Sequence, residues 1–243
     1  MQAARTVPRS AAKTPSPQPS PGGKGGRQRP RLNATLFALL VDGALVTAAL
    51  SAVSVLLGFA VGALVCAAQL ARIPALRSAG AVYVSFFRGV PLLVQLLLIY
   101  NLLPALGINV PGVVAALVGL TLCTAAYQAE ILRGGFLAVP PGLVEAGQMV
   151  GLSPALILLR IRLPLALRLT LPSVVNEAVL ILKASSLVSV VGIADLTRTA
   201  QNIASSTYRP IEAFATAGAL YLVLNAVLIG SGELLGRRMR PGR

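Results

Sequence analysis

Long uncharged stretches alternate with short arginine-bearing ones along the chain. Residues 43–71 carry no charge, and residues 89–129 form a second uncharged run that Pro104 and Pro111 divide. A helix needs about 20 apolar residues to cross a hydrocarbon core of about 30 Å. The pattern therefore predicts five spans, which we place at residues 43–71, 90–103, 112–132, 169–193 and 213–232.

These runs predict an all-α integral membrane protein. They lack the two-residue alternation of barrel strands, and lipid accepts only helices or closed barrels. Composition agrees, because 56% of the 243 residues are hydrophobic and 12% are charged, about half the charge of a typical soluble domain. The mean hydropathy is +0.79.

The positions of the arginines predict the orientation of the spans. Arg72, Arg77 and Arg88, together with the helix breaker Pro74, indicate a loop after the first span. Five spans place this loop on the same side as residues 160–168 and 237–240, which also carry arginines. Cytoplasmic segments are enriched in Lys and Arg, so we expect this side, and the C-terminus, to be cytoplasmic. Seven basic residues in the N-terminal tail would then lie outside, against the rule.

The net charge of +14 does not indicate a nucleic-acid-binding protein. Such a surface needs a basic patch with interleaved aromatic residues, and the basic residues here are spread between the apolar runs. The chain has no His, and its two cysteines, Cys66 and Cys123, lie within apolar runs. We expect both to be buried as small apolar side chains, with no metal site.

Residues 1–31 differ in composition from the rest of the chain. They consist largely of Pro, Ser, Gly, Gln, Lys and Arg and contain no acidic residue. Such a segment cannot bury enough apolar surface to fold, so we expect a disordered basic tail followed by a transmembrane domain at residues 32–243. The tail has no apolar core of the kind found in a signal peptide.

A charged insert, "PPGLVEAGQMVGLSPALILLRIRLPLAL" at residues 140–167, interrupts the apolar pattern. Residues 143–150 suit a short helix, and Gly151 suits the left-handed turn that ends one. Ser153 is a candidate N-cap with Pro154 at the first helical position. Residues 155–163 suit a second helix, which Pro164 limits. Taken alone, such a helix-turn-helix at about residues 138–168 is most often an amphipathic loop on the membrane surface.

The insert resembles the EAA loop of ABC importer permeases, a cytoplasmic helix pair that docks into the ATPase subunit. The matching residues are Glu145, Ala146, Gly147, Gly151, Ile161, Leu163 and Pro164. The flanking segments "FFRGVPLLVQLLLIYNLLP", "AAYQAEILRGGF" and "NEAVLILKASSLVSVVGIADL" resemble the polar amino-acid (histidine/glutamine-type) permeases. Gly147, Leu165, Ala184 and Ser185 depart from the family pattern.

This resemblance implies a type I, MetI-like importer subunit with five transmembrane helices in the bacterial inner membrane. It implies as partners two ATPase subunits, an extracytoplasmic solute-binding protein, and a second permease, identical or homologous, all in a lipid bilayer. The chain has no GxxxxGK[ST] phosphate loop. We therefore expect ATP to be used by the partner, and this chain to bind no cofactor and have no catalytic residues.

Four polar residues in the fourth predicted span are candidates for the translocation path. Asn176, Lys183 and Ser186 are spaced to share one helical face, whereas Glu177 is about 100° away from it. Ionisable groups inside a membrane are costly and usually functional. An ion pair that holds helices together is an equally good interpretation for Lys183 and Glu177. For Glu130 and Arg133, three residues apart, a local helix pair is expected.

Two other functions fit parts of the sequence. A secondary transporter driven by an ion gradient predicts internal repeats and more intramembrane carboxylates, and the chain shows neither. A membrane scaffold that recruits a soluble partner through the insert, without transport, is the third hypothesis. We expect the first function, an ATP-driven importer of a polar amino acid.

Overall fold

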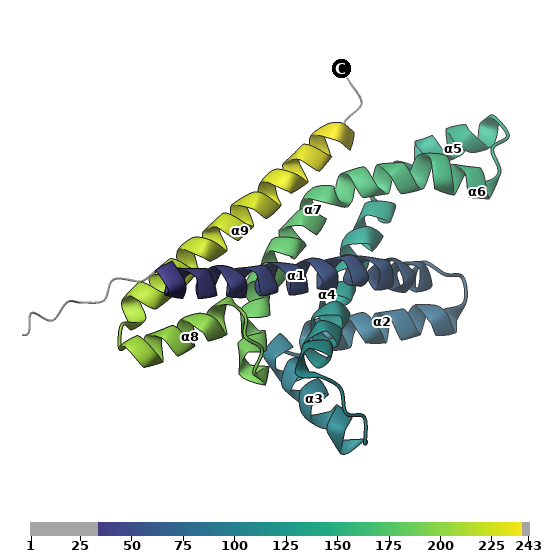
Figure 1. Cartoon of the computed structure of the whole chain (residues 1–243). Coiled ribbons are helices and arrows are strands. Elements are labelled where there is room, and N and C mark those ends of the chain that lie inside the picture. Colours follow the sequence, from purple (N-terminus) through teal and green to yellow (C-terminus); the bar gives the residue numbers. More distant parts are fainter. Residues whose placement is uncertain (1–33, 240–243) are drawn as a thin grey trace, which may run out of the picture. The chain divides into compact units, whose positions relative to one another are not determined.

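The computed structural model describes residues 34–239 of the chain. The chain divides into two units, Met1–Arg31 and Leu32–Arg243. The predicted disordered tail lies outside the described residues, and the account below concerns the second unit. All regular structure in residues 34–239 is helical (Figure 1), which confirms the predicted all-α class.

The helices follow one another with short connections. In chain order they are α1 (Ala34–Gln69), α2 (Pro74–Gly89), α3 (Leu92–Ala105), α4 (Gly112–Leu137), α5 (Pro141–Met149), α6 (Pro154–Ile157), the π-helical η1 (Leu158–Arg162), α7 (Leu163–Ala184), the 3-10 helix η2 (Ser185–Val191), α8 (Leu196–Thr207) and α9 (Pro210–Met239). Four helical runs are long and apolar enough to cross a membrane, namely Ala34–Gln69, Gly112–Leu137, Pro154–Val191 and Pro210–Arg238. The bent pair α2 and α3 makes a fifth if it counts as one span.

The loop predicted around Arg77 and Arg88 is wrong, because both residues lie in helix α2. Pro74 begins this helix instead of breaking the chain, since a proline in the first turn removes no helical hydrogen bond. Helices α2 and α3 are too short to cross a 30 Å core alone, and they meet at 105°. The second predicted span is therefore not a complete span by itself but the second helix of a bent pair.

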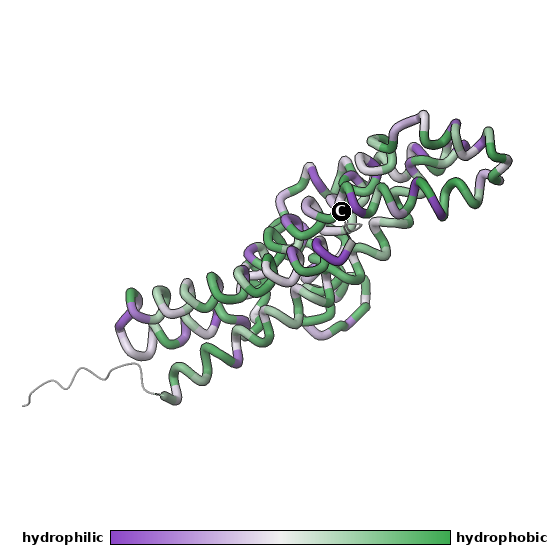
Figure 2. The backbone as a smooth tube through the Cα atoms, turned by 90° about the horizontal axis from the view of Figure 1, so that it is seen from above, coloured by the Kyte–Doolittle hydropathy of each residue, from purple (hydrophilic) through white to green (hydrophobic). Residues whose placement is uncertain are grey.

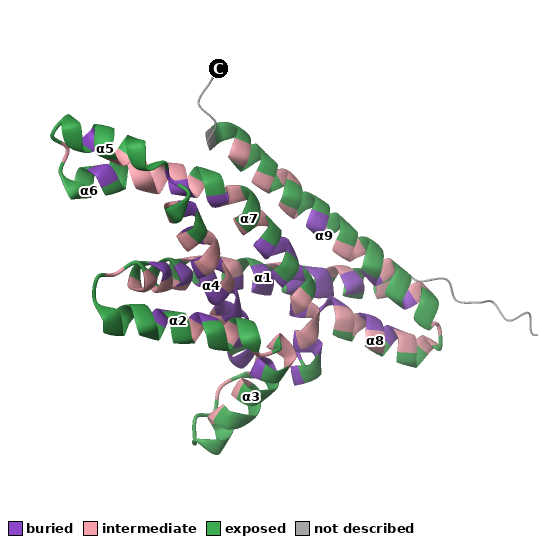
Figure 3. Ribbon diagram, turned by 180° about the vertical axis from the view of Figure 1, so that it is seen from behind, coloured by how far each residue is buried: buried purple, intermediate pink, exposed green. Residues whose placement is uncertain are grey.

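Helix α1 is longer than predicted, since it begins at Ala34 and includes Asp42. It packs along α4 through glycines. A methyl group on Gly62 would lie 2.8 Å from the carbonyl oxygen of Ala125, so a larger residue would push the helices apart. Of the four candidate membrane spans, α4 is the most buried and α9 the most exposed (Figure 3).

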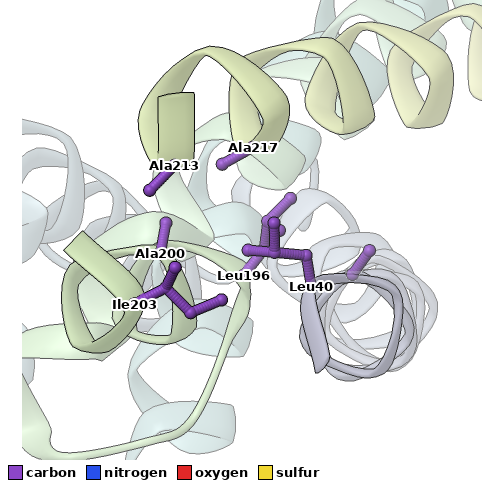
Figure 4. Packing of buried hydrophobic residues seen from close by; sticks show 7 residues of the cluster. Leu40, Leu196, Ala200, Ile203, Ala213 and Ala217 are labelled. Atoms are coloured by element: carbon purple, nitrogen blue, oxygen red, sulfur yellow. The ribbon is translucent and has the colours of Figure 1, made fainter. Parts of the chain in front are cut away.

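A separate apolar cluster joins α1, α8 and α9 (Figure 4). It consists of Leu40, Ala44, Leu196, Ala200, Ile203, Ala213 and Ala217. Helix α8 is amphipathic, and its exposed face carries the polar side chains of Arg198, Asn202, Ser205 and Ser206. The start of α1 thus lies beside the turn between α8 and α9, at the opposite end of α7 from α5 and α6 (Figure 1).

Hydropathy follows this arrangement. The long helices are predominantly apolar, and the segment of α5 and α6 mixes polar and apolar residues (Figure 2). A bilayer that covers the apolar lengths of α4, α7 and α9 leaves α5 with α6 on one side and α8 near the other surface.

Candidate functional site

Helices α5 and α6 form a hairpin that projects from the start of α7 (Figure 1). Gly151 has a φ of 77°, as predicted for the left-handed residue of the turn. The backbone N–H of Leu152 donates to the carbonyl oxygen of Gly147 at 3.0 Å, and that of Gly151 donates to Gln148 at 2.9 Å. This pattern closes the last turn of α5. We call residues 141–162 the hairpin below.

The second arm of the hairpin begins at the predicted N-cap. The hydroxyl of Ser153 accepts a hydrogen bond from the backbone N–H of Leu156 at 3.4 Å, with Pro154 in the first turn. The cap satisfies one of the amide groups that the start of a helix leaves unpaired.

Gly147 is the point at which the two arms touch. It is buried, and a methyl group there would lie 2.9 Å from Cδ1 of Ile161 and 3.3 Å from Cγ1 of Ile157. The small residue lets α5 pack on these two isoleucines. Ile161, one of the predicted site residues, therefore supports the hairpin from inside.

The outer side of the hairpin is exposed and partly apolar. Glu145 and Ala146 are exposed, and at the tip Met149 and Val150 are 89% and 75% exposed. Two large apolar side chains are thus exposed at the tip of the hairpin, close in sequence to the carboxylate of Glu145, which has no ion pair among residues 34–239.

Pro164 does not end the second arm, contrary to prediction. The helix continues through η1 into α7, and the N–H of Leu163 donates to the carbonyl oxygen of Leu158, five residues earlier. Proline lacks an N–H for the carbonyl four residues before it, and the wider π turn accommodates this loss. The helical run that begins at Pro154 therefore reaches Val191 and joins the hairpin directly to the membrane span.

Helix α7 carries three of the four residues predicted to line the translocation path. Asn176 and Lys183 are exposed on it, whereas Ser186 falls in η2 and is half-buried. Lys183 is the one lysine outside the N-terminal tail. Within the described residues it has no ion pair. An ammonium group that is exposed within a span must meet water, an anion or another chain, because lipid does not solvate it.

Glu177 points the other way and is only 5% exposed. Its carboxylate accepts a hydrogen bond from the hydroxyl of Thr124 on α4, at 3.4 Å. Gln128 donates to Thr124 Oγ1 and to the carbonyl oxygen of Val55 on α1, both at 3.2 Å. Glu177 therefore joins α7 to the centre of the bundle, and the structure does not bring it together with Asn176 and Lys183.

Glu130 is the acceptor of a second polar cluster, where α1, α2 and α4 meet. Arg133 donates to both carboxylate oxygens at 3.0 Å, which confirms the predicted local pair. Gln69 also donates to Glu130 at 3.0 Å, and Arg88 lies 3.8 Å away. The sequence pattern gave no indication of these contacts with α1 and α2, because they join residues far apart in the chain.

Two further polar residues were missed. Gln95 is 2% exposed and donates to the carbonyl oxygens of Phe87 and Val90, at 2.9 and 2.7 Å. A lone amide in the apolar run "LLVQLLLIY" was the available signal. Asp195, fully buried, caps α8 by accepting from the backbone N–H groups of Thr197 and Arg198. An acidic residue directly before "LTR" is an N-cap signal.

Burial of Asp195, which lies outside the membrane-spanning helices, raises the pKa of its carboxyl above the ordinary value. The two backbone N–H groups oppose this shift. Among residues 34–239, no three His, Cys, Asp or Glu side chains are grouped as metal ligands would be. Cys66 and Cys123 are buried free thiols.

Comparison with known proteins agrees with this arrangement. Residues 54–241 match the family described as binding-protein-dependent transport system inner membrane component. The chain is 41% identical over 170 residues to the octopine transport system permease protein OccM of Rhizobium meliloti, covering 66% of this chain and 69% of that one.

Two solved structures are also similar. One is an amino acid ABC transporter with histidines, with a TM-score of 0.78, 37% identity, and coverage of 83% of this chain and 94% of that one. The other is the MetNI methionine ABC transporter in inward-facing conformations. Its TM-score is 0.71 and its sequence identity is 24%, with coverage of 86% of this chain and 99% of that one, so it shows a similar fold. The chain belongs to the family of binding-protein-dependent transport system inner membrane components.

Proposed function

We propose that the chain is a permease subunit of an ATP-driven importer for a polar amino acid or a close derivative. The proposal is supported above all by the uninterrupted helical run from Pro154 to Val191, which joins an exposed hairpin to the polar face of a membrane span. One similar protein belongs to an octopine transport system, and another is an amino acid ABC transporter whose structure is described as being with histidines. Both solutes carry a carboxylate and additional nitrogen groups.

The hairpin docks onto a separate ATPase subunit in this proposal. Met149 and Val150 enter an apolar part of the ATPase surface, and Glu145 meets a basic group there. The buried contact of Gly147 with Ile157 and Ile161 makes the two arms move together. Because η1 continues into α7, a displacement of the hairpin moves α7 without an intervening flexible loop. ATP hydrolysis occurs in the ATPase, of which two copies serve the importer.

The path for the solute runs along the exposed face of α7. Asn176, Lys183 and Ser186 line it, and a second permease chain, identical or homologous, supplies the opposite wall. Lys183 pairs with the solute carboxylate. Glu177 contributes by holding α7 to α4 rather than by touching the solute, a revision that its burial and its bond to Thr124 support. An extracytoplasmic binding protein delivers the solute to the side of α8, and the C-terminus is cytoplasmic.

Uptake into proteoliposomes tests the function. The permease is reconstituted with its ATPase and binding protein, and uptake of radiolabelled histidine and arginine is measured with ATP inside. We expect uptake that needs all three components. Uptake driven by a proton or sodium gradient alone would establish a secondary transporter, and ATPase binding without uptake would establish a scaffold.

The coupling role is tested by Glu145→Lys and Gly151→Pro. Both should abolish uptake and ATPase co-purification while the permease remains folded in the membrane. Proline at position 151 cannot adopt the positive φ that the turn requires. Glu233→Lys, the same charge change at an exposed site on α9, is the matched control and should retain both activities.

The path role is tested separately by Lys183→Gln and Lys183→Arg. If Lys183 pairs with the solute carboxylate, Gln should lower uptake on the order of tenfold or more, and Arg should restore part of it, because a charge-assisted pair contributes about 1.5–3 kcal/mol. ATPase binding should stay unchanged. Equal uptake by the wild type and the Gln variant would remove Lys183 from the path without affecting the coupling proposal.

A further inference from the structure

Three arginines gather at one end of α7 and α9. Arg168 lies on α7, Arg237 and Arg238 lie at the end of α9, and all three are exposed. Within the described part of the chain the ion pairs involve Arg88, Arg133 and Arg209, so none of these three has a carboxylate partner there. Like charges so placed repel one another and favour an anion between them.

The packing of the two helices sets the arginines at the same level. A methyl group on Gly232 would touch Val175, and one on Gly236 would lie 3.6 Å from Cδ2 of Leu171. These contacts define an antiparallel register in which residues 237 and 238 lie opposite residues 170 and 169. Arg237 and Arg238 are therefore within about 3 Å of Arg168 along the helix axes, at 1.5 Å per residue.

This level corresponds to lipid headgroups. Residues 213–232 of α9 are uncharged, and about 20 helical residues cross a hydrocarbon core of about 30 Å. Arg237 follows five residues later, roughly 8 Å beyond the core. The guanidinium groups thus lie at the depth of phosphate groups rather than in bulk water.

The apolar side chains beside the arginines complete the site. Three large apolar side chains next to the arginines are also exposed, namely those of Leu169, Leu234 and Leu235. They lie on the membrane side of the arginines, where the acyl chains of a lipid begin. Glu233 is the one acidic residue close to these arginines in the sequence, and it lies one turn before Arg237 on α9. Three arginines outnumber this one carboxylate, so the net charge of the site is positive.

We propose that the ends of α7 and α9 bind the headgroup of an anionic phospholipid. The planar guanidinium groups of Arg168 and Arg237 hold its phosphate by paired hydrogen bonds, Arg238 adds charge, and the leucines contact its acyl chains. Apolar contact at the depth of the phosphate distinguishes a lipid from a small soluble anion. This site does not depend on the transported solute.

Thermal unfolding of the full chain in detergent tests the site. A thiol-reactive fluorophore reports unfolding, because Cys66 and Cys123 are buried and free in the folded protein. Phosphatidylglycerol should raise the unfolding temperature saturably, and phosphatidylcholine should not. In R168Q/R237Q the half-saturating phosphatidylglycerol concentration should rise on the order of thirtyfold, since each arginine near an anionic lipid surface contributes about 1 kcal/mol.

A matched control separates a site from diffuse charge. R72Q/R77Q removes the same charge from the turn between α1 and α2, which holds Arg72, and from the first turn of α2, which holds Arg77. Neither arginine has an ion pair among the described residues, and the variant should leave the titration unchanged. R168K/R237K, which keeps both charges but loses the paired hydrogen bonds of the guanidinium groups, should have an affinity between those of the wild type and R168Q/R237Q. An equal loss in R72Q/R77Q, or equal stabilisation by sn-glycerol 3-phosphate, would overturn the proposal. Loss of ATPase binding by R168Q/R237Q with an unchanged lipid titration would overturn it too, and would assign the arginines to the protein partner.

Discussion

Single residues decide how closely the helices of this protein approach. Gly62 on α1 leaves no room for a side chain against α4, since even a methyl group would be 2.8 Å from a backbone oxygen. Gly218 on α9 has no neighbouring atom within 4 Å of the same position. The sequence presents both simply as glycines in apolar runs, and only the partner helix distinguishes them.

Gly62→Ala should therefore destabilise the protein, and Gly218→Ala should not. Overpacking a tight contact costs about 1–3 kcal/mol, which exceeds the gain of up to about 1 kcal/mol from the higher helix propensity of alanine. Thermal unfolding followed through the buried thiols measures both variants. A higher unfolding temperature for Gly62→Ala would show that α1 and α4 are less tightly packed than described.

Asp195 gives the folded state a specific pH dependence. Because burial raises the pKa of its carboxyl above the unfolded value, the folded protein holds this proton over a range in which the unfolded chain releases it. Its contribution to stability is thus full below the unfolded pKa, about 3.9, and is lost as the pH rises through the folded pKa.

Asp195→Asn tests this linkage, since asparagine caps a helix about as well as aspartate without a charge to bury. The stability gained by the Asn variant over the wild type should grow from pH 4 upward and become constant above the folded pKa. Asp195→Ala, which loses the cap, should be less stable than Asn by about 1 kcal/mol. A constant difference between Asn and Asp across this range would contradict the linkage.

At the scale of elements, the sequence predicted the helices where an apolar run ends in a recognisable signal. Ser153, Pro154 and Gly151 each occupy the predicted position in the hairpin. The predictions failed at prolines. Pro74 begins a helix and Pro164 lies inside one, because a proline is compatible with both a first turn and a π turn. Only the tertiary structure selects between these outcomes and a break.

The elbow between α2 and α3 depends on Gln95. A bend of 105° leaves carbonyl groups of Phe87 and Val90 without helical partners, and the Gln95 amide donates to both. Gln95→Leu should destabilise the protein by about 1–3 kcal/mol, because the carbonyl of Val90 is left unpaired and that of Phe87 keeps only the thiol of Cys123, at 4.0 Å, as a donor.

Asn101→Leu, on the exposed side of α3, is the control for Gln95→Leu. Its amide donates only to Leu97, one turn earlier in the same helix, so its loss should change the unfolding temperature little. If both variants unfold at the same temperature, the elbow is held by packing alone, and the two hydrogen bonds of Gln95 are dispensable.

At the scale of the whole molecule, the sequence predicted the class and the family, but not which side chains meet. Asn176 and Lys183 share an exposed face because their spacing fixes it on any helix. The burial of Glu177 against Thr124, and the contact of Glu130 with Gln69, depend on which helices become neighbours. Hydropathy gives no information about neighbours, since lipid-facing and protein-facing residues are equally apolar.

The path of the chain through the membrane gives a final prediction. Helix α7 leads from the hairpin to α8, and the start of α1 packs beside α8. A cysteine that replaces Met149 should therefore react with an impermeant thiol reagent from one side only, the cytoplasmic side. Cysteines that replace Phe37 and Tyr208, which are both exposed, should react from the opposite side. The native thiols are buried, so the chain without an introduced cysteine gives the background level of labelling. Labelling of Met149→Cys and Tyr208→Cys from the same side would mean that the run from Pro154 to Val191 does not cross the bilayer. The coupling proposal and the placement of the solute path would then both be wrong.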